Sequence, residues 1–171
     1  MRVLVTGASG FIGRHVSAEL HTAGHRITTL HRGGPISLPS AGTAAAPNLE
    51  HTRADVLSEE ARAAVQAADA IVHLAGRGDV QASFREPFEY NRLNALGTLN
   101  VLEAARASGA HVVLASTQRV YRPTSGSICE EAPLEPADPY AHSKLIAEHW
   151  CRMYAELLGV PTTVVRLFSV Y

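Results

Sequence analysis

Apolar runs alternate with helical patterns along the chain, and this alternation predicts the fold class. Six runs rich in β-branched and other apolar residues predict strands. They cover residues 2–6, 26–30, 49–53, 70–74, 111–116 and a last run from 161 to 171. Strands that alternate with helices along a chain favour a parallel sheet with helices on both of its faces. The pattern therefore predicts an α/β domain.

Apolar residues spaced three and four apart predict four helices between these strands. The first places Ile12, Val16 and Leu20 on one face and ends near Gly24. The others cover 58–68, with Ser58 as its cap, 87–107, ended by Gly109, and 139–158, opened by Pro139. Two stretches without helical period, 33–48 and 77–86, are predicted to be loops.

The first thirteen residues, MRVLVTGASGFIG, carry the strongest chemical signal in the chain. The first strand runs into Gly7, and Gly10 and Gly13 follow just before the helical pattern. A helix that begins there points its free N–H groups above the strand, which favours phosphate. Glycines let the backbone approach a pyrophosphate closely. The spacing G-x-x-G-x-x-G differs from the commoner dinucleotide fingerprint, and the alternative is a tight turn without a ligand.

Size, charge and cysteine usage exclude several function classes. The 171 residues suggest one domain, and a net charge of −1 gives no electrostatic case for nucleic acid or an anionic membrane. No apolar run could span a bilayer, and a strand that begins at residue 2 leads us to expect no signal peptide. The nine histidines show no ligand spacing, so we expect no metal site. Cys129 and Cys151 form no ligand pattern, and a reducing cytoplasm is the expected location.

Several segments resemble, in order, the motifs of the extended short-chain dehydrogenase/reductase family, the NAD-dependent epimerases and dehydratases. They are TGASGFIG at the start, HLAG at 73–76, NALGTLNVLEAAR at 94–106, ASTQRVY at 115–121 and PYAHSK at 139–144. The resemblance implies a doubly wound, Rossmann-like parallel sheet in the order 3-2-1-4-5-6. It also implies an NAD(P)-dependent epimerase or reductase that acts on a nucleotide sugar or a similar hydroxylated substrate.

A tyrosine and a lysine four residues apart, Tyr140 and Lys144, share one face of the last helix. A free tyrosine with a pKa of about 10 is a poor base at neutral pH. A lysine cation and an oxidised nicotinamide favour the phenolate, so we expect a lowered pKa. By resemblance, Tyr140 takes the proton of a substrate alcohol, Lys144 also holds the nicotinamide ribose, and Thr117 hydrogen-bonds the substrate oxygen. These three are the candidate catalytic residues.

The resemblance and the strand ends together predict the cofactor-binding residues. An acid at the end of the second strand would select NAD, but this chain has His31-Arg32, so we expect NADP or NAD with a weak preference for NADP. The alternatives are that Arg32 is solvated and that Asp55 ends a strand or caps a turn. Asn94 is expected to brace the active site and is counted with this set. The predicted set is Gly7, Ser9, Gly10, Phe11, Ile12, Gly13, His31, Arg32, Asp55, Val56, Leu74, Ala75, Gly76, Asn94, Tyr140 and Lys144.

The chain departs from the family pattern in two places. Sugar dehydratases of the family place Asp-Glu after the catalytic threonine, whereas this chain has Gln118-Arg119, which disfavours a dehydratase. Its last residues resemble the RxxNVYGP segment, with Ser169 in place of asparagine, and stop inside that motif. We therefore expect 1–171 to be a dinucleotide-binding domain that lacks the C-terminal substrate domain.

Two further expectations concern function class and assembly. The alternative to an enzyme is a dinucleotide-binding module or sensor without turnover. A homodimer is expected through the helices 87–107 and 139–158, since both carry apolar residues beyond one stripe and relatives pair in this way.

Overall fold

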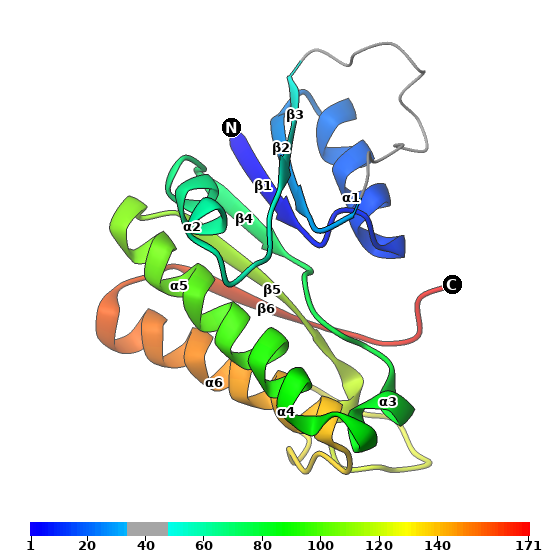
Figure 1. Cartoon of the computed structure of the whole chain (residues 1–171). Coiled ribbons are helices and arrows are strands. Elements are labelled where there is room, and N and C mark those ends of the chain that lie inside the picture. The colour runs from blue at the N-terminus through cyan, green and yellow to red at the C-terminus, as the bar shows by residue number, and fades with distance from the viewer. Residues whose placement is uncertain (34–47) are drawn as a thin grey trace.

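Six parallel strands form one sheet in the computed structural model, which describes residues 1–33 and 48–171. The strand order is β3-β2-β1-β4-β5-β6, which confirms the predicted doubly wound topology (Figure 1). The strands are β1 (Arg2–Thr6), β2 (Arg26–His31), β3 (Leu49–Arg53), β4 (Ala70–His73), β5 (His111–Thr117) and β6 (Thr162–Leu167). Residues 34–47 of the predicted loop 33–48 lie outside the described residues.

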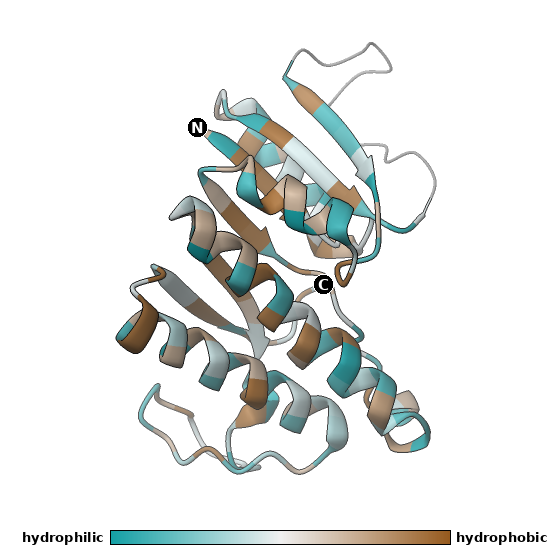
Figure 2. Ribbon diagram, turned by 60° about the vertical axis from the view of Figure 1, so that its left-hand side comes forward, coloured by the Kyte–Doolittle hydropathy of each residue, from teal (hydrophilic) through white to brown (hydrophobic). Residues whose placement is uncertain are grey.

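Helices cover both faces of the sheet, as Figure 1 shows. The helix α1 (Phe11–Thr22) packs on the face to which Val3, Val5 and Ile27 point. The opposite face carries α2 (Glu59–Gln66), α5 (Gly97–Ser108) and α6 (Pro139–Leu158). Because side chains alternate along a strand, Leu4 lies in the second core between Val3 and Val5 in the first. In Figure 2, hydrophobic residues (brown) occur along the strands, and hydrophobic and hydrophilic residues (teal) alternate along the helices.

Two segments between β4 and β5 differ from the prediction. The predicted loop 77–86 contains a short helix, α3 (Val80–Arg85), which Asp79 caps by accepting the Ala82 N–H at 3.0 Å. The predicted single helix 87–107 is three joined pieces, namely α4 (Pro87–Tyr90), a π-helical turn η1 (Asn91–Leu96) and α5. Periodicity misses a π turn because one extra residue leaves the apolar spacing on either side unchanged.

The ends of two other helices agree with the prediction. Ser58 accepts the Ala61 N–H at 3.3 Å and so caps α2. Pro139 opens α6, and Asp138 caps this helix by accepting the Ala141 N–H at 2.8 Å. Within residues 1–33 and 48–171, no helix is both long enough and apolar enough to cross a membrane.

Candidate active site

Two adjoining pockets open where the strand order reverses. From β1 the sheet continues through β2 and β3 on one side and through β4, β5 and β6 on the other, and open sheets of this kind bind ligands at such a point. The pockets measure about 330 and 300 Å³. Gly7, Gly10, Leu74 and Gly76 line both, so the two form one continuous crevice. No cluster of three metal-ligating side chains occurs among the described residues.

The turn between β1 and α1 forms the floor of this crevice. A Cβ atom on Gly7 would lie 2.7 Å from backbone atoms of Leu74 and Ala75. A Cβ on Gly13 would lie 2.3 Å from the Gly7 carbonyl oxygen, so both positions require glycine for close backbone packing. The helix α1 begins at Phe11 without a side-chain cap. Its first N–H groups therefore remain suited to an anion above the sheet.

The first pocket brings together the residues predicted for the adenosine half of the cofactor. Arg32 and Asp55 approach each other across it, with 3.7 Å between guanidinium nitrogen and carboxylate oxygen. Asp55 also accepts the Leu57 N–H at 3.0 Å, as expected of a turn cap. The predicted residues on its wall are Gly7, Ser9, Gly10, His31, Arg32, Asp55, Val56, Leu74, Ala75 and Gly76.

His31 is the unusual residue of the first pocket. Its side chain is 6% exposed, and within the described part of the chain neither ring nitrogen has a hydrogen-bond partner. The ring packs edge-on against His51, with 6.2 Å between centroids. A buried polar group without a partner suggests a place where a ligand atom completes the hydrogen bonding.

The second pocket joins the start of α1 to the tyrosine and lysine of α6. Phe11, Ile12 and Gly13 line one side, and Tyr140 and Lys144 line the other. Sequence reasoning did not assign several of its other lining residues, because the loop after β4 carries no motif and the motifs at the ends of β5 and β6 do not say which of their side chains face a ligand. These are Arg77, Gly78, Ala115, Leu167 and Val170.

The side chain of Thr117 interacts with the phenol of Tyr140. Thr117 is 7% exposed and does not line the pocket wall. Burial raises the pKa of the Tyr140 phenol above its ordinary value, and the interaction with Thr117 opposes that rise. From the sequence we expect a lowered pKa, so the protein groups by themselves do not supply the lowering that the chemistry requires.

Lys144 and His73 lie close together below the pocket. Lys144 is 7% exposed, and burial lowers the pKa of its ammonium group to about 8. Burial and the nearby Lys144 charge lower the pKa of His73 to about 3. The His73 imidazole is therefore neutral at pH 7, with Nδ1 2.7 Å from the Thr6 hydroxyl and Nε2 3.2 Å from the Thr98 hydroxyl. Lys144 is the cation of this pair.

Asn94 lies behind the crevice and does not line either pocket. Its amide pairs twice with the Arg77 backbone, accepting the N–H at 2.8 Å and donating to the carbonyl at 3.0 Å. It also donates to the Ser143 hydroxyl at 2.9 Å, between Tyr140 and Lys144 on α6. Asn94 thus connects α6 to the loop after β4, and its Oδ1 lies behind Gly76 of the crevice wall, 2.6 Å from where a Cβ on that glycine would be.

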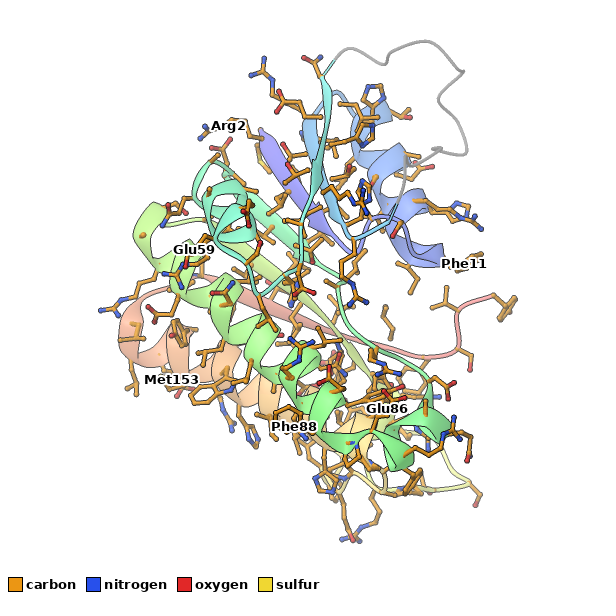
Figure 3. The ribbon with its side chains drawn as sticks, viewed as in Figure 1. Arg2, Phe11, Glu59, Glu86, Phe88 and Met153 are labelled. Carbon is orange, nitrogen blue, oxygen red and sulfur yellow. The ribbon has the colours of Figure 1, made fainter. Side chains whose placement is uncertain are left out.

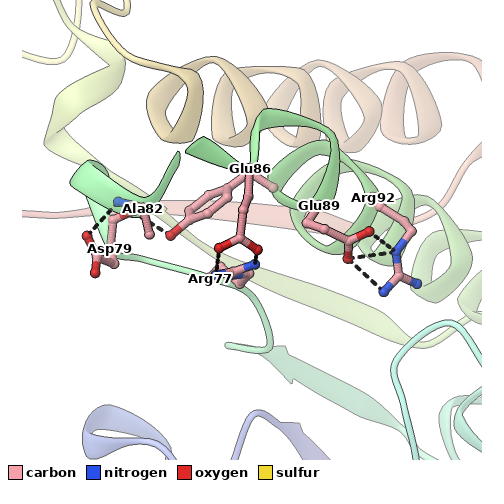
Figure 4. A network of polar contacts seen from close by, with 7 residues as sticks. Arg77, Asp79, Ala82, Glu86, Glu89 and Arg92 are labelled. Atoms are coloured by element: carbon pink, nitrogen blue, oxygen red, sulfur yellow. Dashed lines mark hydrogen bonds and ion pairs between the residues drawn. The ribbon is translucent and has the colours of Figure 1, made fainter. Parts of the chain in front are cut away.

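An ion pair between Arg77 and Glu86 lies beside the second pocket, which Arg77 lines (Figure 4). Arg77 and Glu86 form a two-pronged ion pair, at 2.6 and 3.2 Å. Arg77 also stacks 4.8 Å from the Tyr90 ring centre, and the Tyr90 ring meets Tyr140 edge-on at 6.3 Å. This chain of contacts connects the rim to the Tyr140 ring.

Known proteins similar to this chain include enzymes that act on nucleotide sugars. The model of the NAD dependent epimerase/dehydratase family matches residues 3–171. A probable UDP-glucuronate 4-epimerase of Rhizobium meliloti (strain 1021) is 34% identical, over 100% of this chain and 54% of the relative. A UDP-glucose 4-epimerase of Azospirillum brasilense is 37% identical, over 99% of this chain and 49% of the relative.

Solved structures show the same partial coverage. MoeE5, in complex with UDP-glucose and NAD, is 32% identical with a TM-score of 0.87. The match covers 100% of this chain and 55% of that protein. The chain thus spans about half the length of the relatives it matches.

Proposed function

Since the chain belongs to the NAD-dependent epimerase/dehydratase family, we propose that it is the cofactor-binding portion of an enzyme that oxidises a hydroxyl group of a nucleotide sugar, as an epimerase or reductase. One observation carries this proposal. A single crevice connects the Gly7–Gly13 turn to Tyr140 and Lys144. A dinucleotide needs the turn, and Lys144 would serve both cofactor binding and chemistry, whereas only a chemical step needs the Tyr140 hydroxyl.

The crevice fits a nicotinamide dinucleotide at each of its parts. The uncapped start of α1 suits the pyrophosphate. His31, Arg32, Asp55 and Val56 would enclose the adenosine half, and Lys144 would hold the nicotinamide ribose. When bound, the cofactor supplies a hydride acceptor and a positive ring beside Tyr140.

The residues of the chain would transfer one proton, that of the substrate alcohol, directly to Tyr140. The Tyr140 phenolate oxygen would accept the proton of the substrate alcohol, while the carbon that bears the hydroxyl loses a hydride and becomes a carbonyl. Thr117 would donate a hydrogen bond to the same substrate oxygen. The buried Lys144 cation would favour the phenolate, together with the charge of the oxidised cofactor. Return of the hydride to the opposite face of the carbonyl would complete an epimerisation.

The UDP-sugar 4-epimerases among the relatives support a nucleotide sugar as the substrate class. The test is a panel of UDP-, GDP- and dTDP-sugars with NAD and NADP, followed by absorbance of the reduced nicotinamide and by epimer analysis. The 171 residues tested by themselves span about half of a relative, so we expect them to bind the cofactor but to position the substrate poorly. Positioning alone can lower a reaction barrier by about 7–11 kcal/mol, so turnover should be far slower than that of a full-length relative. Tyr140→Phe should remove the remaining turnover and retain cofactor binding.

A dinucleotide-binding module without turnover is the second candidate, because the uncapped start of α1 suits a pyrophosphate whether or not a chemical step follows. Calorimetry of Gly10→Val tests the cofactor site that both candidates share, since Gly10 lines both pockets and a branched side chain would enter the crevice. Unchanged affinity in that variant would remove both candidates. Cofactor binding without any Tyr140-dependent turnover would favour the binding module.

We further propose that the chain forms a homodimer through α4, α5 and α6. Exposed apolar side chains lie on α4, α6 and the turn η1 that leads into α5, and Figure 3 labels one of them, Phe88. Phe88 is 75% exposed and Leu157 is 74% exposed, so both are available for contact with a second copy of the chain. The exposed set is Phe88, Leu96, Ile146 and Leu157.

The cysteines support a cytoplasmic location, which is also a proposal. Cys129 and Cys151 are both free thiols. Burial raises the pKa of Cys151 to about 12, so its thiolate is scarce at neutral pH. Thiols that stay reduced are typical of a cytoplasmic protein.

A further inference from the structure

Arg119 stands in the short turn that directly follows Thr117. This turn, η2 (Gln118–Val120), begins where β5 ends, and Thr117 Oγ1 accepts the Arg119 N–H at 3.2 Å. The backbone of Arg119 is therefore fixed to the side chain of a candidate catalytic residue. The same position is the one at which the chain departs from the Asp-Glu of the sugar dehydratases.

A buried carboxylate determines where the Arg119 side chain lies. Asp138 is 3% exposed, and its Oδ2 receives Arg119 Nε at 2.8 Å and Nη2 at 2.7 Å. The other oxygen, Oδ1, accepts the Ala141 N–H that caps α6. Tyr140 lies two residues after Asp138 in the first turn of that helix. One carboxylate thus connects the Arg119 cation to the helix turn that carries Tyr140.

We propose that Arg119, held by Asp138, is a positioning residue whose cation acts electrostatically on the Tyr140 hydroxyl. This inference rests on the proposed function, in which Tyr140 transfers the substrate proton. The Arg119 charge lowers the pKa of Tyr140, and the Asp138 charge raises it, so the pair acts on the phenol with opposite signs. Removal of the Arg119 charge would therefore raise the pKa of Tyr140, and removal of the Asp138 charge would lower it.

Other groups face Tyr140 from the elements packed around it. Lys144 lines the same pocket one turn further along α6, and Arg77 lines it from the loop after β4. Tyr90 contributes its ring from α4. None of these residues belongs to the Arg119–Asp138 pair, so their effects stay constant when that pair is changed.

A purely structural role is the competing explanation for Arg119. Arg119 and Arg122 both line a pocket of about 270 Å³ beside the segment 121–138. Arg122 is paired with the exposed Glu135, whereas Arg119, itself partly exposed, is paired with the buried Asp138. If Arg119 only holds this segment in place, loss of the Arg119 charge and loss of the Asp138 charge should shift the pKa of Tyr140 in the same direction.

The test is the titration of Tyr140 in the 171-residue chain, followed by NMR of ring-labelled tyrosine and assigned with Tyr140→Phe. Arg119→Gln should raise the pKa of Tyr140 measurably, although solvent weakens the effect because the Arg119 side chain is 46% exposed. Asp138→Asn should lower it, because asparagine keeps the helix cap and loses the charge. Arg119→Lys should stay near the parent value, and Arg122→Gln is the matched control that should not move it.

Two outcomes would overturn the proposal. One is an unchanged Tyr140 pKa in Arg119→Gln, and the other is a shift of the same sign in Arg119→Gln and Asp138→Asn. If Arg119→Gln fails to fold, the parent chain is titrated in low and high salt, where screening of the exposed Arg119 should raise the pKa of Tyr140 and a constant value would refute the idea. The titration needs no cofactor, whereas failure of the proposed function would appear in calorimetry as a lack of NAD(P) binding.

Discussion

Single residues of the site differ in chemistry because their surroundings differ. Tyr140 and Lys144 lie on one helix face, yet burial raises the pKa of the first and lowers that of the second, because burial disfavours the charged form of either group. His73 is the extreme case, because burial and the nearby Lys144 charge both lower the pKa of its imidazole, whose two nitrogens lie within hydrogen-bond distance of threonine hydroxyls. Its neutral form connects β4 to β1 and to α5 at the base of the crevice.

The buried His73 predicts an acid-sensitive stability. In the unfolded chain this histidine takes up a proton near pH 6.5, whereas in the folded chain its pKa is about 3. Unfolding therefore takes up a proton between these values, and stability falls as the pH is lowered through this window. His73 should contribute about 2 kcal/mol to the loss between pH 7 and pH 5.

Urea denaturation at a series of pH values measures this contribution. His73→Gln, whose amide can pair with both threonine hydroxyls, should show a flatter dependence of the unfolding free energy on pH. His142→Gln changes an exposed histidine and should keep the parent slope. Equal slopes in all three proteins would contradict the assignment to His73.

Arg32 carries the prediction for cofactor preference. Its side chain is 64% exposed and its guanidinium lies 3.7 Å from Asp55, so we expect it to be free to pair with a 2′-phosphate. Loss of a hydrogen bond to a charged group costs about 1.5–3 kcal/mol. Arg32→Ala should therefore weaken NADP binding about tenfold or more and leave NAD binding nearly unchanged in calorimetry. Equal losses for both cofactors, or tighter NAD binding by the parent chain, would reject the NADP preference.

At the scale of elements, α6 connects the site to the edge of the sheet. Glu148, one turn after Lys144, is 6% exposed and receives the Arg166 guanidinium of β6 at 2.7 Å. Ser116, at the end of β5, donates its hydroxyl hydrogen to the same carboxylate. Arg166 also donates to the Tyr121 hydroxyl at 2.8 Å. This buried network holds β5, β6 and α6 together directly beside the second pocket.

Removal of one charge from this network should be far more harmful than removal of both. Arg166→Met leaves the Glu148 carboxylate buried and unpaired, which should lower the free energy of unfolding by about 3–5 kcal/mol. The double variant Arg166→Met with Glu148→Gln should regain most of that loss, since the amide can still accept from Ser116. Denaturant titration compares the three proteins, and a double variant as unstable as Arg166→Met would show that the effect is not one of unpaired charge.

At the scale of the whole molecule, the helix layer of α4, η1, α5 and α6 predicts self-association. Leu96 is 50% exposed and Ile146 is 39% exposed, and both lie on helices of this layer. Light scattering should give the mass of a dimer at high protein concentration. Leu96→Glu and Ile146→Glu should shift it to a monomer, because a buried unpaired charge opposes association.

A matched change outside this layer serves as the control for the dimer. Leu134 is 40% exposed in the segment between β5 and α6, so Leu134→Glu should keep the dimer. Circular dichroism checks that each variant is folded. A monomeric parent chain at high concentration would count against the proposed assembly.

The sequence by itself determined the strands, the glycine turn and the tyrosine–lysine pair, because each of these patterns lies within a few neighbouring residues. The order of the strands in the sheet followed from the resemblance to a known family. The Gly7–Gly13 turn and the pair on α6 line the crevice as the sequence predicts, and the predicted topology brings them together.

Only the tertiary structure decided how distant residues act on one another. Asn94 is buried in a π turn that leaves no periodic signal in the sequence. Arg119 is connected to the helix turn of Tyr140 through Asp138, which lies nineteen positions further along the chain. The pKa directions of Tyr140, Lys144 and His73 follow from burial, which no short stretch of sequence encodes. Burial and long-range charge are sums over neighbours that folding brings together, so they become readable only once the strands and helices are in place.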